Sequence, residues 1–159
     1  MKFTAARTSV FGSFCVGLAV VTGFEMPVVH LLAHGASWLV HVVIAAVNVW
    51  TWVWLYRERR AMLAAAHVVD EAGLHIALGR RWRGLIEWSK IAAVARVTDG
   101  RSTKGKGTIR VTPLEAPNVE IVATEVVTLR GSYGIERRGD RVLLYVDDPD
   151  GLVQSLRRR

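Results

Sequence analysis

Hydrophobic residues are concentrated in the first third of the chain, where they form two long runs. From Val10 to Tyr56 the only residue with a formal charge is Glu25. A helix that crosses a membrane needs about 20 mostly apolar residues. Residues 10–33 and 37–56 meet this requirement, and only the short segment "HGAS" separates them. The pattern therefore predicts an antiparallel helical hairpin that crosses a bilayer twice.

The residues at the ends of these runs predict an orientation. Aromatic side chains gather at the end of the second run, as they do at membrane interfaces: Trp50, Trp52, Trp54 and Tyr56. Lys and Arg flank the hairpin on one side and are absent from its turn, which predicts that both termini are cytoplasmic. Residues 57–66 are good helix formers and are expected to continue the second helix as a cytoplasmic stalk.

After residue 66 the pattern changes to short β-branched runs separated by turn residues, which is typical of strands linked by hairpins. The last element differs, because Asp148 can cap a helix and Pro149 suits its first position. Leu152, Val153 and Leu156 would share one face of that helix. We expect an α+β soluble domain over residues 67–159, a partly open β-barrel of five to seven strands capped by a C-terminal helix, joined to a membrane part over residues 1–66.

A polar cluster lies inside the apolar hairpin. If the turn is centred on "HGAS", His30 and His41 face each other at equal depth. His34 lies one helical turn from His30, and Glu25 lies deeper in the bilayer. Ionisable groups at such depth usually point into the bundle and pair with one another.

Several interpretations of this cluster remain open. Glu25, either protonated or hydrogen-bonded to a histidine or to Asn48, could simply pin the hairpin. Alternatively, the three histidines with Glu25 could bind a metal ion, because imidazoles four residues apart on a helix can share one. A proton-relay or catalytic role and a ligand pocket are further alternatives. No other cofactor is expected.

Small residues recur four apart on the first apolar run, a spacing that lets helices approach closely in lipid. The pairs are Ser13 with Gly17 and Ala19 with Gly23. This face could pack against a protein partner or a second copy of the chain, or only against the protein's own second helix.

Two basic segments in the second part are candidates for binding lipid headgroups or other anions. In "DGRSTKGKGTIR", Arg101, Lys104 and Lys106 stand among glycines that let a backbone approach a phosphate. In "GRRWRG", three arginines surround a tryptophan that could reach the membrane interface: Arg80, Arg81 and Arg83. Each segment could equally be a charged, solvated loop.

The net charge of the chain and the sequence motifs it lacks argue against several classes of function. The net charge is +7 at pH 7, and a basic module beside a bilayer is drawn to anionic headgroups. Aromatic residues do not interleave with the basic loop as single-strand readers require, so we expect no nucleic-acid partner. The nucleotide-binding and hydrolase motifs are missing, among them the P-loop, G-x-S-x-G and H-E-x-x-H. We therefore expect a protein that is not an enzyme.

Three segments of the second part resemble the bacterial pleckstrin-homology-like (PH-like) domain proteins, small membrane proteins in which helical spans precede such a domain. These segments are "VVDEAGLHI", "LIEWSKIAAV" and "LLYVDDPDGLVQSL". The segments "FEMPVVH", "APNVEIV" and "DDPDGLV" also look like a group of uncharacterised bacterial membrane proteins with this two-part layout. The resemblance implies a PH-like fold and a location in the bacterial plasma membrane, and it carries over no catalytic residues.

These observations lead to one expected function and one alternative. The first is a non-enzymatic adaptor or scaffold that presents a PH-like binding domain at the cytoplasmic face of the membrane. The alternative is a membrane-embedded unit that binds metal or handles protons through Glu25, His30, His34 and His41.

Overall fold

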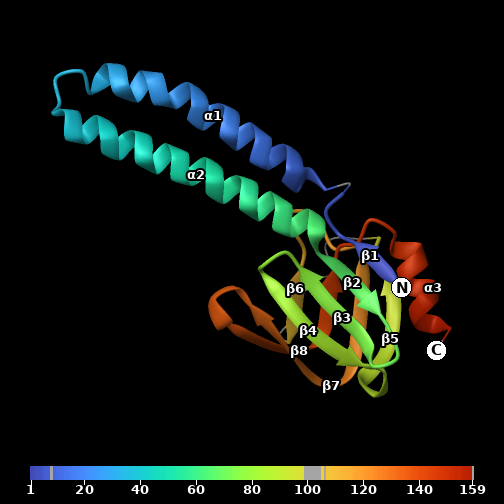
Figure 1. Cartoon of the computed structure of the whole chain (residues 1–159). Helices are drawn as coiled ribbons and strands as arrows, with labels where there is room; N and C mark the ends of the chain where they lie inside the picture. The colour runs from blue at the N-terminus through green and yellow to red at the C-terminus, as the bar shows by residue number, and fades with distance from the viewer. Residues whose placement is uncertain (8, 99–104, 106, 159) are drawn as a thin grey trace.

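The protein consists of a long helical hairpin that projects from one end of a β-sheet domain (Figure 1). The structure is a computed structural model, and it describes residues 1–7, 9–98, 105 and 107–158. Helix α1 spans Val10–Leu32 and helix α2 spans Trp38–Ala64. A tight turn joins them, closed by a hydrogen bond of 2.8 Å from the Ala36 nitrogen to the Ala33 carbonyl. The predicted antiparallel hairpin is confirmed.

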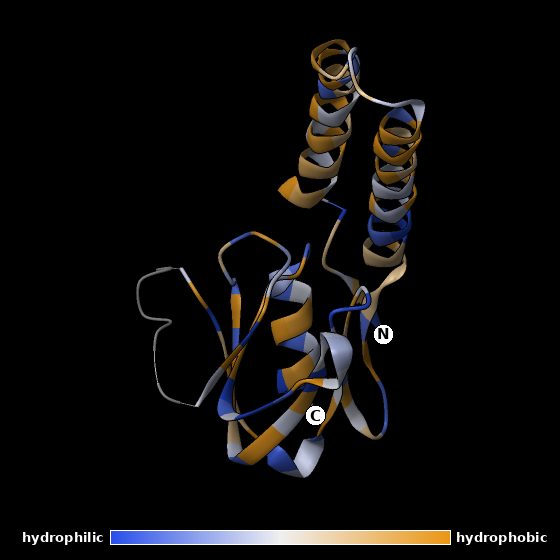
Figure 2. Cartoon of the chain, turned by 90° about the vertical axis from the view of Figure 1, so that its left-hand side faces the viewer, coloured by the Kyte–Doolittle hydropathy of each residue, from blue (hydrophilic) through white to orange (hydrophobic). Residues whose placement is uncertain are grey.

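The hairpin exposes most of its apolar side chains. Among the described residues, two helices are long and apolar enough to cross a membrane, and these are α1 and α2. Only 6% of the most apolar stretch of each is buried, whereas the core helix of a soluble protein would be mostly covered. Figure 2 shows the contrast between the largely hydrophobic residues of the helices and the mixture of hydrophobic and hydrophilic residues in the sheet domain. The stalk also has the predicted structure, since α2 continues without a break to Ala64.

The second part is a mixed sheet that does not close into a barrel. Its order is β1-β2-β3-β4-β7-β8-β6, with β5 paired to β7. Neighbours are antiparallel except for β6 and β8, which are parallel. In the described residues the sheet has eight strands: β1 (Lys2–Thr4), β2 (Ala66–Val69), β3 (Gly73–Leu78), β4 (Trp82–Glu87), β5 (Ile91–Arg96), β6 (Thr108–Val111), β7 (Val119–Gly131) and β8 (Glu136–Leu144).

Strand β7 bends the sheet. Its first half pairs with β5 and its last two residues pair with β4, so two strands share one of its edges in succession. On its other edge the register with β8 shifts between Val122 and Val127. A β-bulge of this kind bends a strand and increases its twist. The bend lets the sheet wrap around a continuous apolar core without closing.

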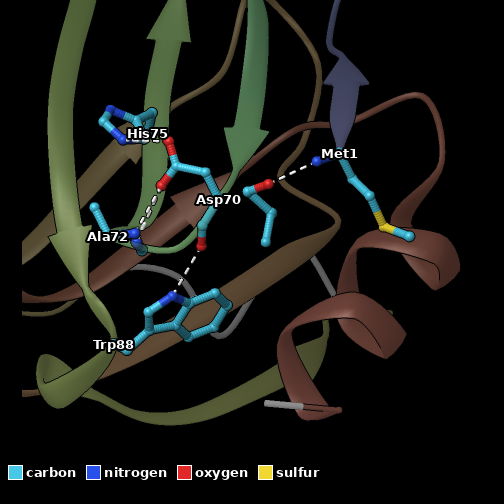
Figure 3. A network of polar contacts seen from close by, with 7 residues as sticks. Met1, Asp70, Ala72, His75 and Trp88 are labelled. Carbon is cyan, nitrogen blue, oxygen red and sulfur yellow. Dashed lines mark hydrogen bonds and ion pairs between the residues drawn. The ribbon is translucent and has the colours of Figure 1, made fainter.

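The residues before the hairpin also belong to the sheet, which the sequence analysis did not predict. Strand β1 pairs with β2 in antiparallel register, and the Met1 nitrogen donates a 2.6 Å hydrogen bond to the Val69 carbonyl. Figure 3 shows this contact beside the Asp70 turn, where the Asp70 carboxylate accepts from the Ala72 nitrogen and the Trp88 indole donates to the Asp70 carbonyl. Both ends of the hairpin are thus attached to one sheet.

The C-terminal helix α3 (Pro149–Arg157) has the predicted start and the predicted buried face. The Asp148 carboxylate accepts a hydrogen bond of 2.9 Å from the Gly151 nitrogen, which caps the helix. Its apolar side chains are buried in the core: Leu152, Val153 and Leu156. The helix packs on β5, where the Arg157 side chain donates to the Val94 carbonyl. The helix therefore covers one opening of the sheet (Figure 1).

Candidate functional site

The structure brings His30 and His41 together across the hairpin, as their positions predict. Their Nδ1 atoms lie 2.9 Å apart, and the two rings stack with centroids separated by 5.1 Å. At this distance one Nδ1 donates and the other accepts, so the rings must differ in tautomer or protonation state. The contact is therefore one hydrogen bond between the two rings, and its direction depends on their tautomers.

The structure does not bring the other two members of the predicted cluster to this pair. Glu25 and His34 are both exposed, and Glu25 lies beside Val21, Phe24, Val28 and Val29 on the outer face of α1. The Asn48 amide donates to the Ile44 carbonyl of its own helix. Within the described ranges, no three His, Cys, Asp or Glu side chains are grouped as they would be to hold a metal ion.

The two small-residue pairs of α1 lie on different faces. A Cβ added at Gly23 would touch the Trp52 ring at 3.4 Å, so this glycine faces α2. The Trp52 indole also donates to the Thr22 hydroxyl at 2.9 Å. By contrast, nothing lies within 4 Å of a Cβ added at Gly17, which is exposed together with Ser13. One pair serves the contact between the two helices, and the other remains open to a partner.

The basic segments have separate positions. Arg101, Lys104 and Lys106 lie outside the described residues. Arg83 lies on the sheet in a shallow groove with Arg130 and Glu136. Trp82 is half-buried and packs against the hydrophobic core.

Arg80 and Arg81, in contrast, face helix α2. The Arg81 guanidinium lies 3.0 Å from the Glu58 carboxylate and 5.3 Å from the centre of the Phe11 ring. Gly79, immediately before them, has a φ of +55° and lies against Met62, since an added Cβ would come within 2.5 Å of the Met62 sulfur. The β3–β4 turn is therefore held tightly against the stalk.

A cleft of about 720 Å³ lies where this turn, the β7–β8 turn and α2 meet. Its lining comprises Trp50, Trp54, Glu58, Arg80, Arg81, Ser132 and Tyr133. A smaller hollow beside it adds Val53 and Arg57. One wall is thus aromatic and apolar, and the other is cationic.

Tyr133 stands at the edge of this cleft in an unusual conformation. It belongs to the short helical turn η2 (Ser132–Gly134), its φ is 60°, and its side chain is fully exposed. A non-glycine residue in the left-handed region is uncommon, and such residues cluster at functional sites. The next exposed apolar side chain, Ile135, follows two residues later.

The sequence analysis identified single members of this cleft and not the cleft itself. It assigned the tryptophans to an interfacial belt and the arginines to a basic loop. Trp50 and Trp54, four residues apart, share a helix face, and this spacing was the available signal. No sequence pattern pointed to Tyr133 as a cleft residue, because its position depends on the long β7–β8 hairpin.

One further ionisable group is buried outside the cleft. His67 on β2 has no exposed surface, and its Nδ1 accepts a hydrogen bond of 3.3 Å from the Ala77 nitrogen. Its Nε2 makes no hydrogen bond of normal geometry with a described residue. Burial lowers the pKa of His67 to about 4, and the backbone of Tyr145 opposes this shift. At neutral pH the ring is uncharged and structural.

Comparisons of the chain with protein-family models, with curated proteins and with solved structures find no match. Its function therefore has to be inferred from its own residues and geometry.

Proposed function

We propose that the protein is a membrane-anchored, non-enzymatic adaptor whose hairpin crosses a bacterial plasma membrane twice. Both termini lie in the cytoplasm, and the sheet domain presents a binding surface beside the inner leaflet. The lack of basic residues in the turn and the exposed apolar surface of both helices support this arrangement.

The observation that carries the proposal is the rigid attachment of the sheet to the hairpin. Strand β1 ends shortly before α1 begins, and β2 starts at Ala66, directly after α2. Across the junction the Arg7 nitrogen donates to the Asp147 carboxylate, and the Val10 nitrogen donates to the Glu115 carboxylate. Flexible linkers let a domain sample many positions, whereas these connections hold the sheet domain against the end of the hairpin. A fixed position favours a scaffold over a mobile tethered enzyme.

The sheet domain belongs, in this proposal, to the PH-like class. An open, bent sheet with a capped C-terminal helix supports this assignment. Its binding surface for a protein partner includes the bulged segment of β7, where Val126 is exposed, and the loop before β7, where Leu114 is exposed. Bulges are over-represented beside functional sites, and exposed apolar side chains mark interaction surfaces where they gather.

Site-specific photo-crosslinking in living cells tests the adaptor function. The photoreactive residue benzoylphenylalanine replaces Val126 or Leu114 in the full chain, and His34 in a control that places it in the hairpin turn. We expect adducts of one defined mass from a sheet position and none from His34. The absence of adducts at both sheet positions, or the same adduct from all three, would contradict the proposal.

A second candidate function rests on the His30–His41 contact. Two hydrogen-bonded imidazoles inside an apolar hairpin suit one step of a proton pathway or a two-ligand metal site. Metal analysis of the detergent-purified protein decides the metal alternative. Stoichiometric metal that disappears in His30→Ala and persists in His34→Ala would support it, and metal-free wild-type protein would oppose it.

A further inference from the structure

In the proposed membrane arrangement, the cleft between α2 and the sheet lies at the level where the bilayer meets water. Trp50 and Trp54 line it from α2, and tryptophan prefers the headgroup region of a membrane. Arg57 is three residues further toward the sheet, about 4.5 Å along the helix axis. The cleft thus changes from aromatic to cationic in the direction that leads out of the membrane. Figure 1 shows the β7–β8 turn on the same side of the sheet as the hairpin.

The charges of the cleft do not cancel. Glu58 is its only acidic lining residue in the part of the chain that the structure describes, and the Arg81 guanidinium pairs with it at 3.0 Å. Arg57 and Arg80 are exposed and have no carboxylate partner among the described residues. Arg80 in the cleft and Arg57 in the hollow beside it therefore lack a counter-ion within the described residues.

The shape and lining identify the class of ligand. A volume of about 720 Å³ is in the range of small-molecule sites. A free phosphate ion would leave the wall of Trp50, Val53 and Trp54 without a partner. A phospholipid has both parts, because its glycerol and upper acyl chains are apolar while its phosphate is anionic. Tyr133 at the mouth adds an aromatic ring with a hydroxyl group, a combination suited to this boundary.

We propose that this cleft binds the headgroup of one anionic phospholipid from the leaflet next to the sheet domain. Arg57 and Arg80 contact the phosphate, while Trp50, Val53 and Trp54 contact the glycerol and upper acyl chains. The ion pair between Glu58 and Arg81 holds the two walls at a fixed separation. The proposal depends on the proposed membrane anchoring and names the lipid class that the anchored protein selects.

Native mass spectrometry of the full chain in detergent tests the lipid site. The probes are dioctanoyl phosphatidylglycerol, dioctanoyl phosphatidylcholine and inorganic phosphate. We expect one tightly bound phosphatidylglycerol per chain, weaker binding of phosphatidylcholine, and no retained inorganic phosphate. Each well-placed arginine contributes about a fivefold gain in affinity for an anionic lipid, so the double variant Arg57→Gln/Arg80→Gln should bind phosphatidylglycerol about 25-fold more weakly.

A variant with the same loss of charge is the control. Arg110 and Arg158 are exposed and lie outside the cleft, so Arg110→Gln/Arg158→Gln should keep the wild-type affinity. Equal binding of the two lipids, or equal losses in both double variants, would overturn the proposal. Retention of inorganic phosphate as strong as that of the lipid would show an anion site without lipid selectivity, and would overturn it too. These titrations are made in detergent, so a negative result would contradict the lipid site and leave the proposed topology untouched. The topology is tested separately, by labelling from the two sides of the membrane.

Discussion

The helical hairpin and the sheet domain bury their apolar residues in opposite ways. In the sheet domain, core side chains such as Leu74, Ile121 and Leu144 are fully covered by their neighbours. In the hairpin, large apolar side chains such as Phe24, Leu31 and Trp38 are mostly exposed. Exposed apolar area costs free energy in water and none in lipid. The comparison shows that the chain has two kinds of surface, an exposed apolar surface on the hairpin and a mixed surface over a buried core in the sheet domain.

The largest expected effect tests the core of the sheet domain. Leu156→Ala should lower the free energy of unfolding by about 2–5 kcal/mol, because it leaves a cavity beneath α3. Arg158→Ala should change it little, since an exposed arginine leaves no cavity. Thermal and denaturant melts of the full chain in detergent provide the measurement. The full chain is needed because β1 contributes the buried Phe3 to the core. Equal stabilities of the two variants would show that α3 contributes little to the stability of the sheet domain.

The buried His67 predicts that the stability of the sheet domain depends on pH. Its pKa is about 4 in the folded protein and 6.5 ordinarily, so the unfolded chain binds a proton more readily. Its contribution to stability is complete above pH 6.5 and is lost as the pH falls toward 4, about 3 kcal/mol in total.

The variant His67→Asn isolates this contribution, since its amide oxygen can still accept from the Ala77 nitrogen. Denaturant unfolding at pH 7 and pH 4.5 should show a smaller loss of stability in the variant than in the wild type. Parallel losses in the two proteins would mean that other groups cause the acid sensitivity.

Loss of the ion pair between the β3–β4 turn and α2 is expected to have an intermediate effect on the free energy of unfolding. Arg81→Met removes the partner of Glu58, whose side chain is only 11% exposed. The expected cost is about 2 kcal/mol, between the values typical of exposed and of buried ion pairs. Lys90→Met breaks the more exposed pair with Glu87 and should cost less than about 1 kcal/mol. Limited proteolysis should also cut near Ala65 faster in Arg81→Met than in Lys90→Met. Equal rates would show that the ion pair between Arg81 and Glu58 does not hold the sheet domain to α2.

The smallest expected effect compares two glycines. Gly79→Ala should destabilise by about 1–2 kcal/mol, because alanine disfavours a φ of +55° and its Cβ would press on Met62. Gly17→Ala lies in a helix with open space around it and should stabilise by roughly 0.5–1 kcal/mol. Melting temperatures in detergent give the sign of each change. A stabilising Gly79→Ala would show that the β3–β4 turn is not pressed against the stalk.

The sequence predicted most of the fold because its signals were local. The lengths of the two apolar runs and the position of the "HGAS" turn predicted the hairpin and its register, including the contact between His30 and His41. Capping residues and an apolar stripe gave α3. The pairing of β1 with β2 was not predictable in this way, because three residues at the chain start carry too short a pattern and their partner lies more than 60 residues away.

The candidate site was less predictable for the same physical reason. Depth along a helix follows from residue number, but the direction in which a side chain points depends on how the helices rotate against each other. Glu25 was therefore expected to pair within the bundle, whereas it lies on the outer face of α1. The cleft beside Trp54 and Arg80 joins residues from three elements, and only the folded junction brings them together.

The most direct test of the proposed membrane arrangement is a labelling experiment from each side of the membrane. Cys15 is buried and is first replaced by alanine, and a single cysteine is then placed at Ser37 or at Arg158. A membrane-impermeant maleimide applied to intact cells should label Ser37→Cys, and it should label Arg158→Cys only after the membrane is opened. Labelling of Arg158→Cys in intact cells, or protection of Ser37→Cys until the cells are opened, would contradict the account.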